Sequence, residues 1–579
     1  MKLLNFFQRK ALIFILVLYL IIASVGIFFN YSLFNTTGDE APLLSATLKM
    51  IADHSLRPNY PSFYHLSLGA YLYLPFFLIW LILMRLSGLF PDLAAIAQFG
   101  QVEFAKFLPL ARFISVLAGL ACLYLLYKIC EKLFSQRLIS LLATFFLSVS
   151  LLFVQASHFA RIWIPQIMAV LLAFYFIINL YQAKKDRLKD YLLCGLGIGL
   201  AFGMHVVGVF SYVSFLAAHY LKNKNEKIKQ IIFNKFFWQA NLALVIVYFI
   251  VYYLNTYGFT RYLGGVLPNP NKMLSLSSTF DLITDRPDIS DQSGAADSAA
   301  KMLLFYLKAL WQYEPLILLS AVFGSVILFI KRQRDILLII FSFIVIYCLA
   351  ISSISMKSQR YLLPIMPFLA IMAAYGLAWL YHRAKNKKII GGLIVFFCLL
   401  LLYPPLLWDY KFLLPSSRLE AVNWIYKNLP PNESIINLDQ GLELNESRQS
   451  LLDIEKYSKF LTKKRAYLLN SPDQIFPQPN YYVFFYPHYA PQIPAEIIKK
   501  KFNYLIISWW DKNNFLAKLA ELEKLNLAEK DLILIKRFPA GAQEFDIGLD
   551  LGGSIDWPLK NLPKLKQNGP IVDIYKIKY

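Results

Sequence analysis

Long apolar runs alternate with short basic clusters along the first 407 residues of the chain. A membrane-spanning helix needs about 20 mostly apolar residues. Two shorter, glycine-containing helices are predicted within 190–221, meeting near His205. We therefore expect an α-helical polytopic membrane protein with about 11–13 transmembrane helices. The long runs lie at 11–29, 109–127, 138–156, 164–181, 236–254, 315–330, 336–354, 361–380 and 389–407.

The basic clusters predict the orientation of the helices. They occur at 128–137, 184–189, 222–229, 331–334 and 383–388, and cytoplasmic loops of membrane proteins carry an excess of Lys and Arg. The first apolar run follows Lys2, Arg9 and Lys10 and lacks a clear cleavage site, so we interpret it as a retained helix with a cytoplasmic N-terminus. The segments expected outside are 30–65, 157–163, 255–314, 355–360 and all residues after about 408.

Residues 66–84 do not fit a simple alternation of sides. They are apolar enough to span, yet a single crossing there would place the basic cluster at 128–137 on the outside. Either this segment pairs with a weak return segment near 88–107, or it is re-entrant on the outer face. The number of membrane crossings that the basic clusters require is compatible with either arrangement.

The chain changes character after residue 407. Short strand-like runs occur at 481–485, 504–508 and 531–535, with a helix-like stretch from Asn514 to Leu527. This alternation is typical of an α/β fold. We predict a transmembrane domain over 1–407, with a first outer loop at 30–65, and an extracytoplasmic α/β domain over 408–579.

Composition narrows the class of protein. The chain is 58% hydrophobic and 16% charged, with a mean hydropathy of +0.49, which argues against a water-soluble enzyme. The net charge of +22 is distributed among the basic loops, so no nucleic-acid partner is expected. The five cysteines lie in or beside apolar runs, and no disulfide framework is expected in the C-terminal region. Frequent Lys and Asn favour a bacterial source, and hence the plasma membrane.

Adjacent carboxylates, Asp39 and Glu40, follow the first apolar run. A lipid-linked substrate would present its head group at this level, which makes them candidate catalytic residues. The same residues equally fit the beginning of a helix, where Thr37 or Asp39 would cap and acids in the first turn are favoured by the helix dipole. Both interpretations can hold together.

Basic and aromatic residues at the expected outer ends of helices are candidate ligand-binding residues. Arg112 and Arg360, with Lys357 beside it, either extend to the membrane surface or hold a phosphate, whose oxygens a guanidinium matches in bidentate fashion. Glu314 is similarly ambiguous. A lone histidine at an interface is more often structural than a metal ligand, and the sequence leaves a divalent metal open. Further candidates for the pocket are Tyr60, Tyr64, His65, His158, Arg161 and His205.

The order of these motifs resembles the GT-C superfamily of membrane glycosyltransferases, in particular the branch similar to protein O-mannosyltransferases and aminoarabinose lipid A transferase. It comprises the carboxylate pair, the Tyr-Pro-x-x-Tyr turn at 60–64, the helix at Arg112, Ser-His-Phe-Ala at 157–160 and Arg-Tyr-x-x-Pro-x-x-Pro at 360–367. The resemblance covers about residues 10–410 and extends to the C-terminal region.

The resemblance implies a polyprenyl-phosphate sugar donor within the membrane lipids and transfer on the outer face to a protein, lipid or glycan acceptor. It also implies that Asp39 acts as the base or positions the acceptor, with Glu40 as its neighbour. Cationic side chains would stabilise the charge that develops on the leaving phosphate, and inversion by a single displacement is expected.

Two positions depart from the pattern of such families. Where relatives commonly carry an acidic residue after the Ser-His-Phe-Ala turn, this chain has Trp163, and where they carry Lys it has His205. The first difference puts a metal site shared with these families in doubt, and both together leave open an altered donor or a catalytically silent membrane subunit. A transporter of lipid-linked glycans is a separate alternative. A transporter is expected to carry ionisable residues at mid-membrane, and the apolar runs contain almost none.

Overall fold

The computed structural model describes residues 2–29, 40–52, 55–58, 68–88, 104–262, 299–353, 358–414, 416–439, 441–457, 463–472, 476–486, 493–509, 512–539, 558–564 and 569–579. The chain forms two compact units. The first comprises Met1–Val25, Pro42–Leu78 and Leu110–Leu406, and the second comprises Gly26–Ala41, Ile79–Pro109 and Leu407–Tyr579.

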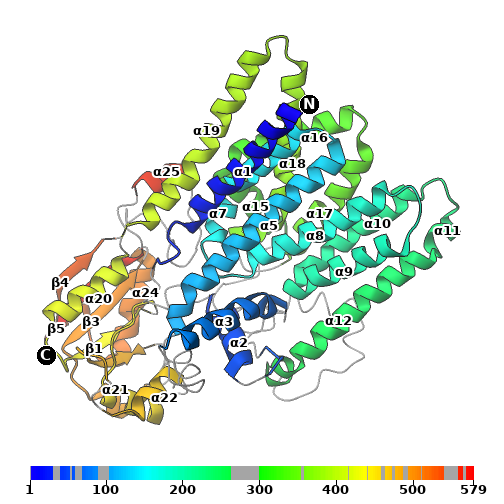
Figure 1. The fold of residues 1–579 in the computed structure, drawn as a ribbon. Coiled ribbons are helices and arrows are strands. Elements are labelled where there is room, and N and C mark those ends of the chain that lie inside the picture. The colour runs from blue at the N-terminus through cyan, green and yellow to red at the C-terminus, as the bar shows by residue number, and fades with distance from the viewer. Residues whose placement is uncertain are drawn as a thin grey trace. The chain divides into compact units, whose positions relative to one another are not determined.

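Helices lying wholly or mainly in the first unit make up a bundle (Figure 1). They are α1 (Lys2–Ser24), α2 (Ala41–Ala52), α3 (Leu68–Leu86), α5 (Leu108–Phe134), α6 (Arg137–Ser148), α7 (Leu151–Ser157), α8 (Trp163–Gln182), α9 (Leu188–Met204), α10 (Ser211–Lys222), α11 (Ile228–Ile232), α12 (Lys235–Tyr262), α15 (Ala299–Tyr313), α16 (Pro315–Ile330), α17 (Arg334–Ser352), α18 (Met366–Arg383) and α19 (Lys387–Phe412). Two 3-10 helices join them, η3 (Val206–Phe210) and η4 (Gln359–Ile365).

Small residues set the closest helix contact that we describe, between α16 and α18. A Cβ on Gly324 would lie 1.8 Å from the carbonyl oxygen of Met372, and one on Gly376 would lie 2.9 Å from the Cα of Gly324. Glycine at both positions therefore lets the two backbones meet, as in many membrane helix pairs. Elsewhere α9 packs between α8 and α12, and α10 packs on α8 and α17.

Seven helices among the described residues are long and apolar enough to cross a membrane, or nine if each of two bent pairs counts as one span. Two shorter apolar helices, Lys10–Ser24 and Val206–Lys222, add to these. The protein is thus an integral multi-pass membrane protein, as predicted. The described part of the range 66–84, from residue 68 on, lies in α3, one of the seven.

One predicted helix is broken. The run at 138–156 forms α6 and α7, which meet at an angle of 59°. The predicted helix at 315–330 is intact as α16, and α15, which lies within the predicted outer segment 255–314, meets it at 109°. Hydrophobicity alone predicted a single helix over 138–156, because it does not register that Ser150 caps a new one: its Oγ accepts a hydrogen bond from the backbone N–H of Phe153 at 3.3 Å. The break predicted at His205 is confirmed, since α9 ends at Met204.

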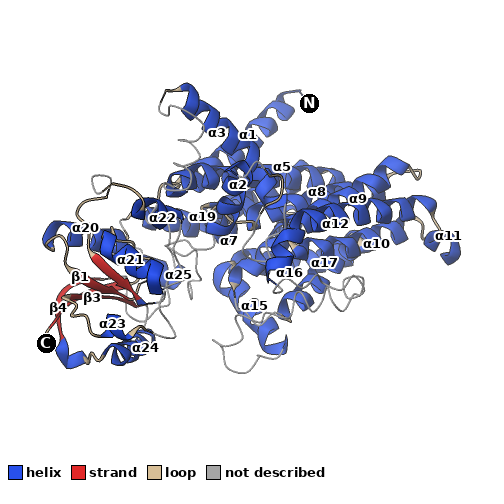
Figure 2. Ribbon diagram, turned by 90° about the horizontal axis from the view of Figure 1, so that it is seen from below, coloured by secondary structure: helices blue, strands red, loops and turns tan. Residues whose placement is uncertain are grey.

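The second unit contains a five-stranded sheet (Figure 2). Its order is β2 (Tyr482–Phe485), β1 (Ser434–Asn437), β3 (Tyr504–Trp509), β5 (Ile571–Ile577) and β4 (Leu532–Phe538). The first three are parallel, and β5 runs antiparallel to both of its neighbours. The same unit includes α20 (Ser417–Asn428), α21 (Arg448–Tyr457), α22 (Lys463–Leu469), α23 (Ala495–Ile498), α24 (Lys512–Leu522), α25 (Pro558–Asn561) and the 3-10 helices at Phe104–Phe107, Glu523–Leu525, Glu529–Asp531 and Leu562–Lys564.

Alternation along the strands gives the sheet two apolar faces. Ile435 and Ile506 pack in a core with α20, whereas their neighbours Ile436 and Leu505 pack in a second core with α21, α22 and α24. Successive strand residues point to opposite faces, so helices cover both sides. The predicted α/β fold is confirmed, and the side of the membrane on which it lies stays a prediction.

Candidate functional site

Two arginines flank one aromatic ring in the first unit. The guanidinium carbon of Arg112, in the second turn of α5, lies 5.9 Å from the centroid of Phe159, and that of Arg161 lies 5.1 Å from the same ring. Both arginines are buried. Phe159 belongs to the short turn between α7 and α8, so this turn brings together residues that are about fifty positions apart in the sequence.

A second aromatic group lies directly after that turn. The ring of Trp163, the first residue of α8, lies 5.0 Å from the ring of His205 and 5.2 Å from that of Tyr361. The guanidinium carbon of Arg360 is 6.0 Å from Trp163 and 5.9 Å from Tyr361. The structure thus brings the candidate residues His205 and Arg360 together with Trp163, which departs from the expected pattern. We call Arg112, Phe159, Arg161, Trp163, His205, Arg360 and Tyr361 the arginine–aromatic cluster.

Buried hydrogen bonds fix the elements that carry the cluster. Glu314, at the break between α15 and α16, accepts hydrogen bonds from Ser150 Oγ at 2.6 Å and from the backbone N–H of Leu152 at 3.0 Å. It thereby holds the beginning of α7. The hydroxyl of Tyr347 donates to the carbonyl of Tyr361 at 2.8 Å and holds η4. Glu314, which was ambiguous in the sequence, is a residue that positions helices.

His158 and His205 lie in different elements and make different hydrogen bonds. His158 is fully buried at the end of α7, and its Nδ1 lies 2.7 Å from the carbonyl oxygen of Val154 one turn earlier. Because a carbonyl only accepts, that nitrogen carries the hydrogen. His205 lies at the break after α9, where its Nδ1 accepts from the backbone N–H of Val207 at 3.4 Å.

Most of the first outer loop lies outside the described residues. The candidates in the loop that are not described are Asp39, Tyr60, Tyr64 and His65. Lys357, which precedes η4, is not described either. Glu40 is described: it is fully buried and directly precedes α2. That position agrees with the helix-start interpretation of the carboxylate pair. Its role in catalysis stays a prediction.

One buried polar residue was not singled out by the sequence analysis. Gln166 lies three residues after Trp163 in α8, is fully buried, and has no hydrogen bond to either amide atom within the described part of the chain. A Cβ on Gly208 would lie 2.8 Å from its Nε2. The available signal was an amide in the first turn of a mostly apolar helix, which gives no indication of what it faces.

A separate charged cluster lies at the carboxyl ends of β1 and β3 in the second unit. Arg418 donates to both carboxylate oxygens of Asp439, at 2.7 and 2.9 Å, and Lys518 donates to Ser508 Oγ at 3.3 Å. Burial alone would raise the pKa of Asp439, but the charge and hydrogen bonds of Arg418 outweigh it and hold that pKa below its usual range. Burial lowers the pKa of Lys518, although Asp439 opposes this. These groups bind one another, which indicates a structural ion-pair network.

The chemistry available in the arginine–aromatic cluster is that of anion recognition. Guanidinium groups donate paired hydrogen bonds to phosphate oxygens, and aromatic faces pack against apolar or sugar-ring surfaces. Among the described residues there is no group of three or more His, Cys, Asp or Glu side chains that could hold a metal ion. The described part of the site therefore offers cations rather than metal ligands.

Residues 96–253 match a known family. Its description is "Dolichyl-phosphate-mannose-protein mannosyltransferase". The matched segment contains Arg112, Phe159, Arg161, Trp163 and His205, that is, most of the arginine–aromatic cluster. The resemblance predicted from the sequence is confirmed over this segment.

Two solved structures resemble the whole chain at low similarity. The ArnT of Cupriavidus metallidurans bound to undecaprenyl phosphate is 12% identical, with 97% of each chain covered and a TM-score of 0.43. The same protein in the apo state is 12% identical, with 93% of each chain covered and a TM-score of 0.43. Similarity at this level is too low to transfer a residue role or a ligand. No curated protein matches the chain by sequence.

Proposed function

We propose that this protein is an integral membrane glycosyltransferase that moves a sugar from a polyprenyl-phosphate donor to a protein, lipid or glycan acceptor on the outer face of the membrane. The observation that carries the proposal is the coincidence of two features. The segment that matches the mannosyltransferase family, 96–253, is also the segment that supplies Arg112, Arg161 and the Trp163–His205 pair to one cluster.

The cluster acts on the donor phosphate. In the transfer, the bond between the anomeric carbon and the phosphate oxygen breaks, and the acceptor oxygen forms a new bond to that carbon. Polyprenyl phosphate leaves with additional negative charge, which the guanidinium groups of Arg112, Arg161 and Arg360 stabilise. A phosphate is a good leaving group, so the step needs a base for the acceptor hydroxyl more than an acid.

Asp39 is that base in our proposal, with Glu40 as its neighbour and Lys357 as a further cation at the donor phosphate. These assignments rest on the order of motifs in the sequence. Displacement in one step inverts the configuration at the anomeric carbon. The N-terminus is cytoplasmic, and the active site and the α/β domain are extracytoplasmic, on the argument of the basic loops.

The proposal is tested in membranes that carry the wild-type protein or the Asp39→Asn variant at equal expression. Each is given a panel of radiolabelled polyprenyl-phosphate sugars together with extracts that supply acceptors. We expect transfer by the wild type from one donor and its loss in Asp39→Asn. Equal transfer by both would remove Asp39 from the mechanism, and no transfer from any donor with acceptors present would favour a silent subunit.

A further inference from the structure

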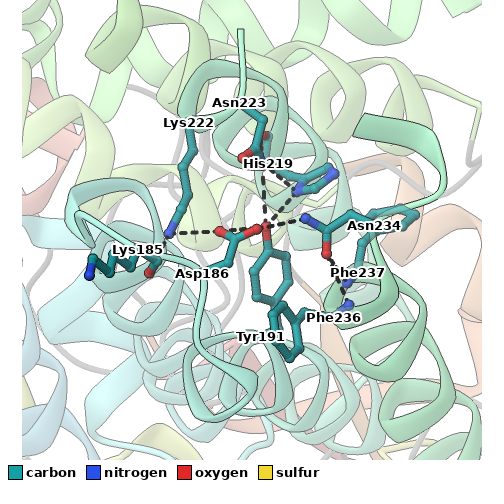
Figure 3. A network of polar contacts seen from close by, with 9 residues as sticks. All are labelled: Lys185, Asp186, Tyr191, His219, Lys222, Asn223, Asn234, Phe236 and Phe237. Carbon is teal, nitrogen blue, oxygen red and sulfur yellow. Dashed lines mark hydrogen bonds and ion pairs between the residues drawn. The ribbon is translucent and has the colours of Figure 1, made fainter. Parts of the chain in front are cut away.

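A network of polar contacts lies next to the short helix α11 (Ile228–Ile232), and Figure 3 shows its side chains. His219 of α10 contacts the carbonyl oxygen of Ile231 through Nε2 at 3.0 Å. Since a carbonyl only accepts, Nε2 carries the hydrogen, and Nδ1 accepts from the hydroxyl of Tyr191 at 2.9 Å. Phe237 stacks on the imidazole at 4.6 Å. The backbone of α11 is thus fixed to α9, α10 and α12.

Asp186 completes this network and fixes where α11 ends. Its carboxylate is 3.1 Å from Lys222 Nζ and accepts from Asn234 Nδ2 at 2.6 Å (Figure 3). The Oδ1 of the same Asn234 accepts from the backbone N–H groups of Phe236 and Phe237, at 2.9 and 3.2 Å. Asn234 therefore caps α12 and separates it from α11.

The opposite side of α11 is apolar and exposed. Ile228 and Ile232, one turn apart, are 72% and 50% exposed, and the following Phe233 is 68% exposed. Trp238, 55% exposed, donates from Nε1 to the carbonyl oxygen of Ile232 at 2.9 Å, so its indole covers the end of α11. We call these four residues the α11 patch.

Lysines surround the α11 patch. Between residues 222 and 238 the sequence has five lysines and one carboxylate, Glu226. Lys227, Lys229 and Lys235 are exposed, whereas Lys222 is committed to Asp186 and Lys224 to Asp335. Exposed apolar side chains next to lysines are typical of a segment that lies in the surface of a bilayer and attracts anionic lipids.

We propose that the α11 patch and Lys227, Lys229 and Lys235 form a binding site for anionic phospholipids. The patch enters the boundary between head groups and acyl chains, and the three lysines contact head-group phosphates. The charge of the lysines selects anionic over zwitterionic lipids. The contacts of His219 with Ile231 and of Asp186 with Asn234 keep α11 in position for this contact. The inference is independent of the enzymatic activity proposed above.

Site-specific photocrosslinking tests the proposal on the full-length protein. Phe233 is replaced by p-benzoylphenylalanine, and the protein is placed in nanodiscs of equal parts phosphatidylglycerol and phosphatidylcholine. The ratio of the two lipid adducts after illumination is the readout. A second probe at Phe249, exposed on α12, reports the general lipid environment. We expect phosphatidylglycerol to be enriched roughly tenfold or more at position 233, on the basis of about fivefold per lysine, and nearly equal adducts at 249.

The triple variant Lys227→Gln, Lys229→Gln, Lys235→Gln should lose the enrichment at position 233 while still forming lipid adducts. A matched triple, Lys385→Gln, Lys387→Gln, Lys388→Gln, removes the same charge from another exposed basic loop and should keep the enrichment. An absence of lipid adducts at 233 in the wild type would overturn the proposal. Equal ratios at 233 and 249, or enrichment that survives in the first triple variant, would do the same.

Discussion

Arg112 and Arg161 are buried side chains in an apolar helical bundle, and burial of a guanidinium is costly unless it is paired or serves a ligand. Both lie beside Phe159, and Arg360 lies beside Trp163 and Tyr361. Arginine differs from lysine in its planar fork of donors, which suits two phosphate oxygens at once. Phosphate binding by these side chains therefore depends on guanidinium geometry as well as on charge.

Replacing Arg112 with Lys keeps the charge and removes the fork. We expect kcat/KM for sugar transfer to fall by roughly 10²–10³, the usual effect of losing one donor at a developing anion. The matched control is Arg334→Lys at the exposed first residue of α17, which should transfer at the wild-type rate. Steady-state kinetics on purified protein measure both. Equal rates for Arg112→Lys and wild type would show that Arg112 is structural.

Trp163 and His205, the two departures from the expected family pattern, are in contact. The sequence showed them as two separate differences, but the structure indicates one coupled change, with a ring pair where a carboxylate and an ammonium group are expected. The variant Trp163→Asp replaces a buried ring with a carboxylate and His205→Lys introduces a buried cation, whereas the double variant places the two charges together as an ion pair.

We expect each single variant to be destabilised by about 3–5 kcal/mol. The loss in free energy of unfolding of the double variant should be smaller than the sum of the two single losses by about 0.5–3 kcal/mol. Thermal unfolding of the detergent-solubilised protein provides the measurement. Strict additivity of the two changes would contradict the coupling.

Breaks between helices position the turns that carry the candidate site. Hydrophobicity predicted where apolar helices lie, and it predicted the interruption at His205 because glycines and a polar residue cluster there. It did not predict the bend at Ser150, since the partner that stabilises this break, Glu314, is 164 positions away. Long-range partners of this kind leave no periodic signal in the sequence.

The contact between α16 and α18 provides a prediction at this scale. Gly324→Ala places a methyl group against the backbone carbonyl of Met372, and overpacking of this kind typically costs about 1–3 kcal/mol. Gly392→Ala in α19 is the matched control, because a Cβ there would have no neighbour within 4 Å. Thermal unfolding should show a lower Tm for the first and an unchanged or slightly higher Tm for the second. Equal Tm values would contradict the close packing.

The whole chain combines a helical membrane unit with an α/β unit, and the sequence predicted both classes. Apolar runs and alternating strands are local signals, and these identified the two folds. The meeting of Arg112, the 158–163 turn, His205 and Arg360 is a tertiary property, and it was expected only through the order of motifs in a known superfamily. Gln166 was missed for the same reason: it lies against Gly208 of another element.

The α/β unit should lose stability in acid. The pKa values of Asp439 and Asp453 are both held low, against the effect of burial, by Arg418 and by Lys500 with Tyr482 respectively. A carboxylate with a lowered folded pKa stabilises the fold above its unfolded pKa of about 3.9, and this contribution is lost as the pH falls through the folded value.

Hydrogen exchange of the full-length protein, corrected for intrinsic rates, should therefore show constant protection of the sheet from pH 7 to 5 and a loss below about pH 4. Asp439→Asn leaves Arg418 buried without its anion. The free energy of opening obtained from exchange of the sheet amides should therefore fall by about 3–5 kcal/mol at neutral pH. The difference between the variant and the wild type should shrink in acid. A difference that is unchanged at pH 3 would rule out the stabilising role of the ionised Asp439.

The central claim, that this protein transfers sugars rather than moves or binds lipid-linked glycans, is tested most directly by the fate of the donor bond. Purified wild-type protein is given a donor labelled in both the sugar and the polyprenyl phosphate, together with acceptor. The account predicts that free polyprenyl phosphate appears in equal amount to glycosylated acceptor, and that neither appears with Asp39→Asn. Donor that stays intact while changing sides of the membrane, or that binds without turnover, would contradict it.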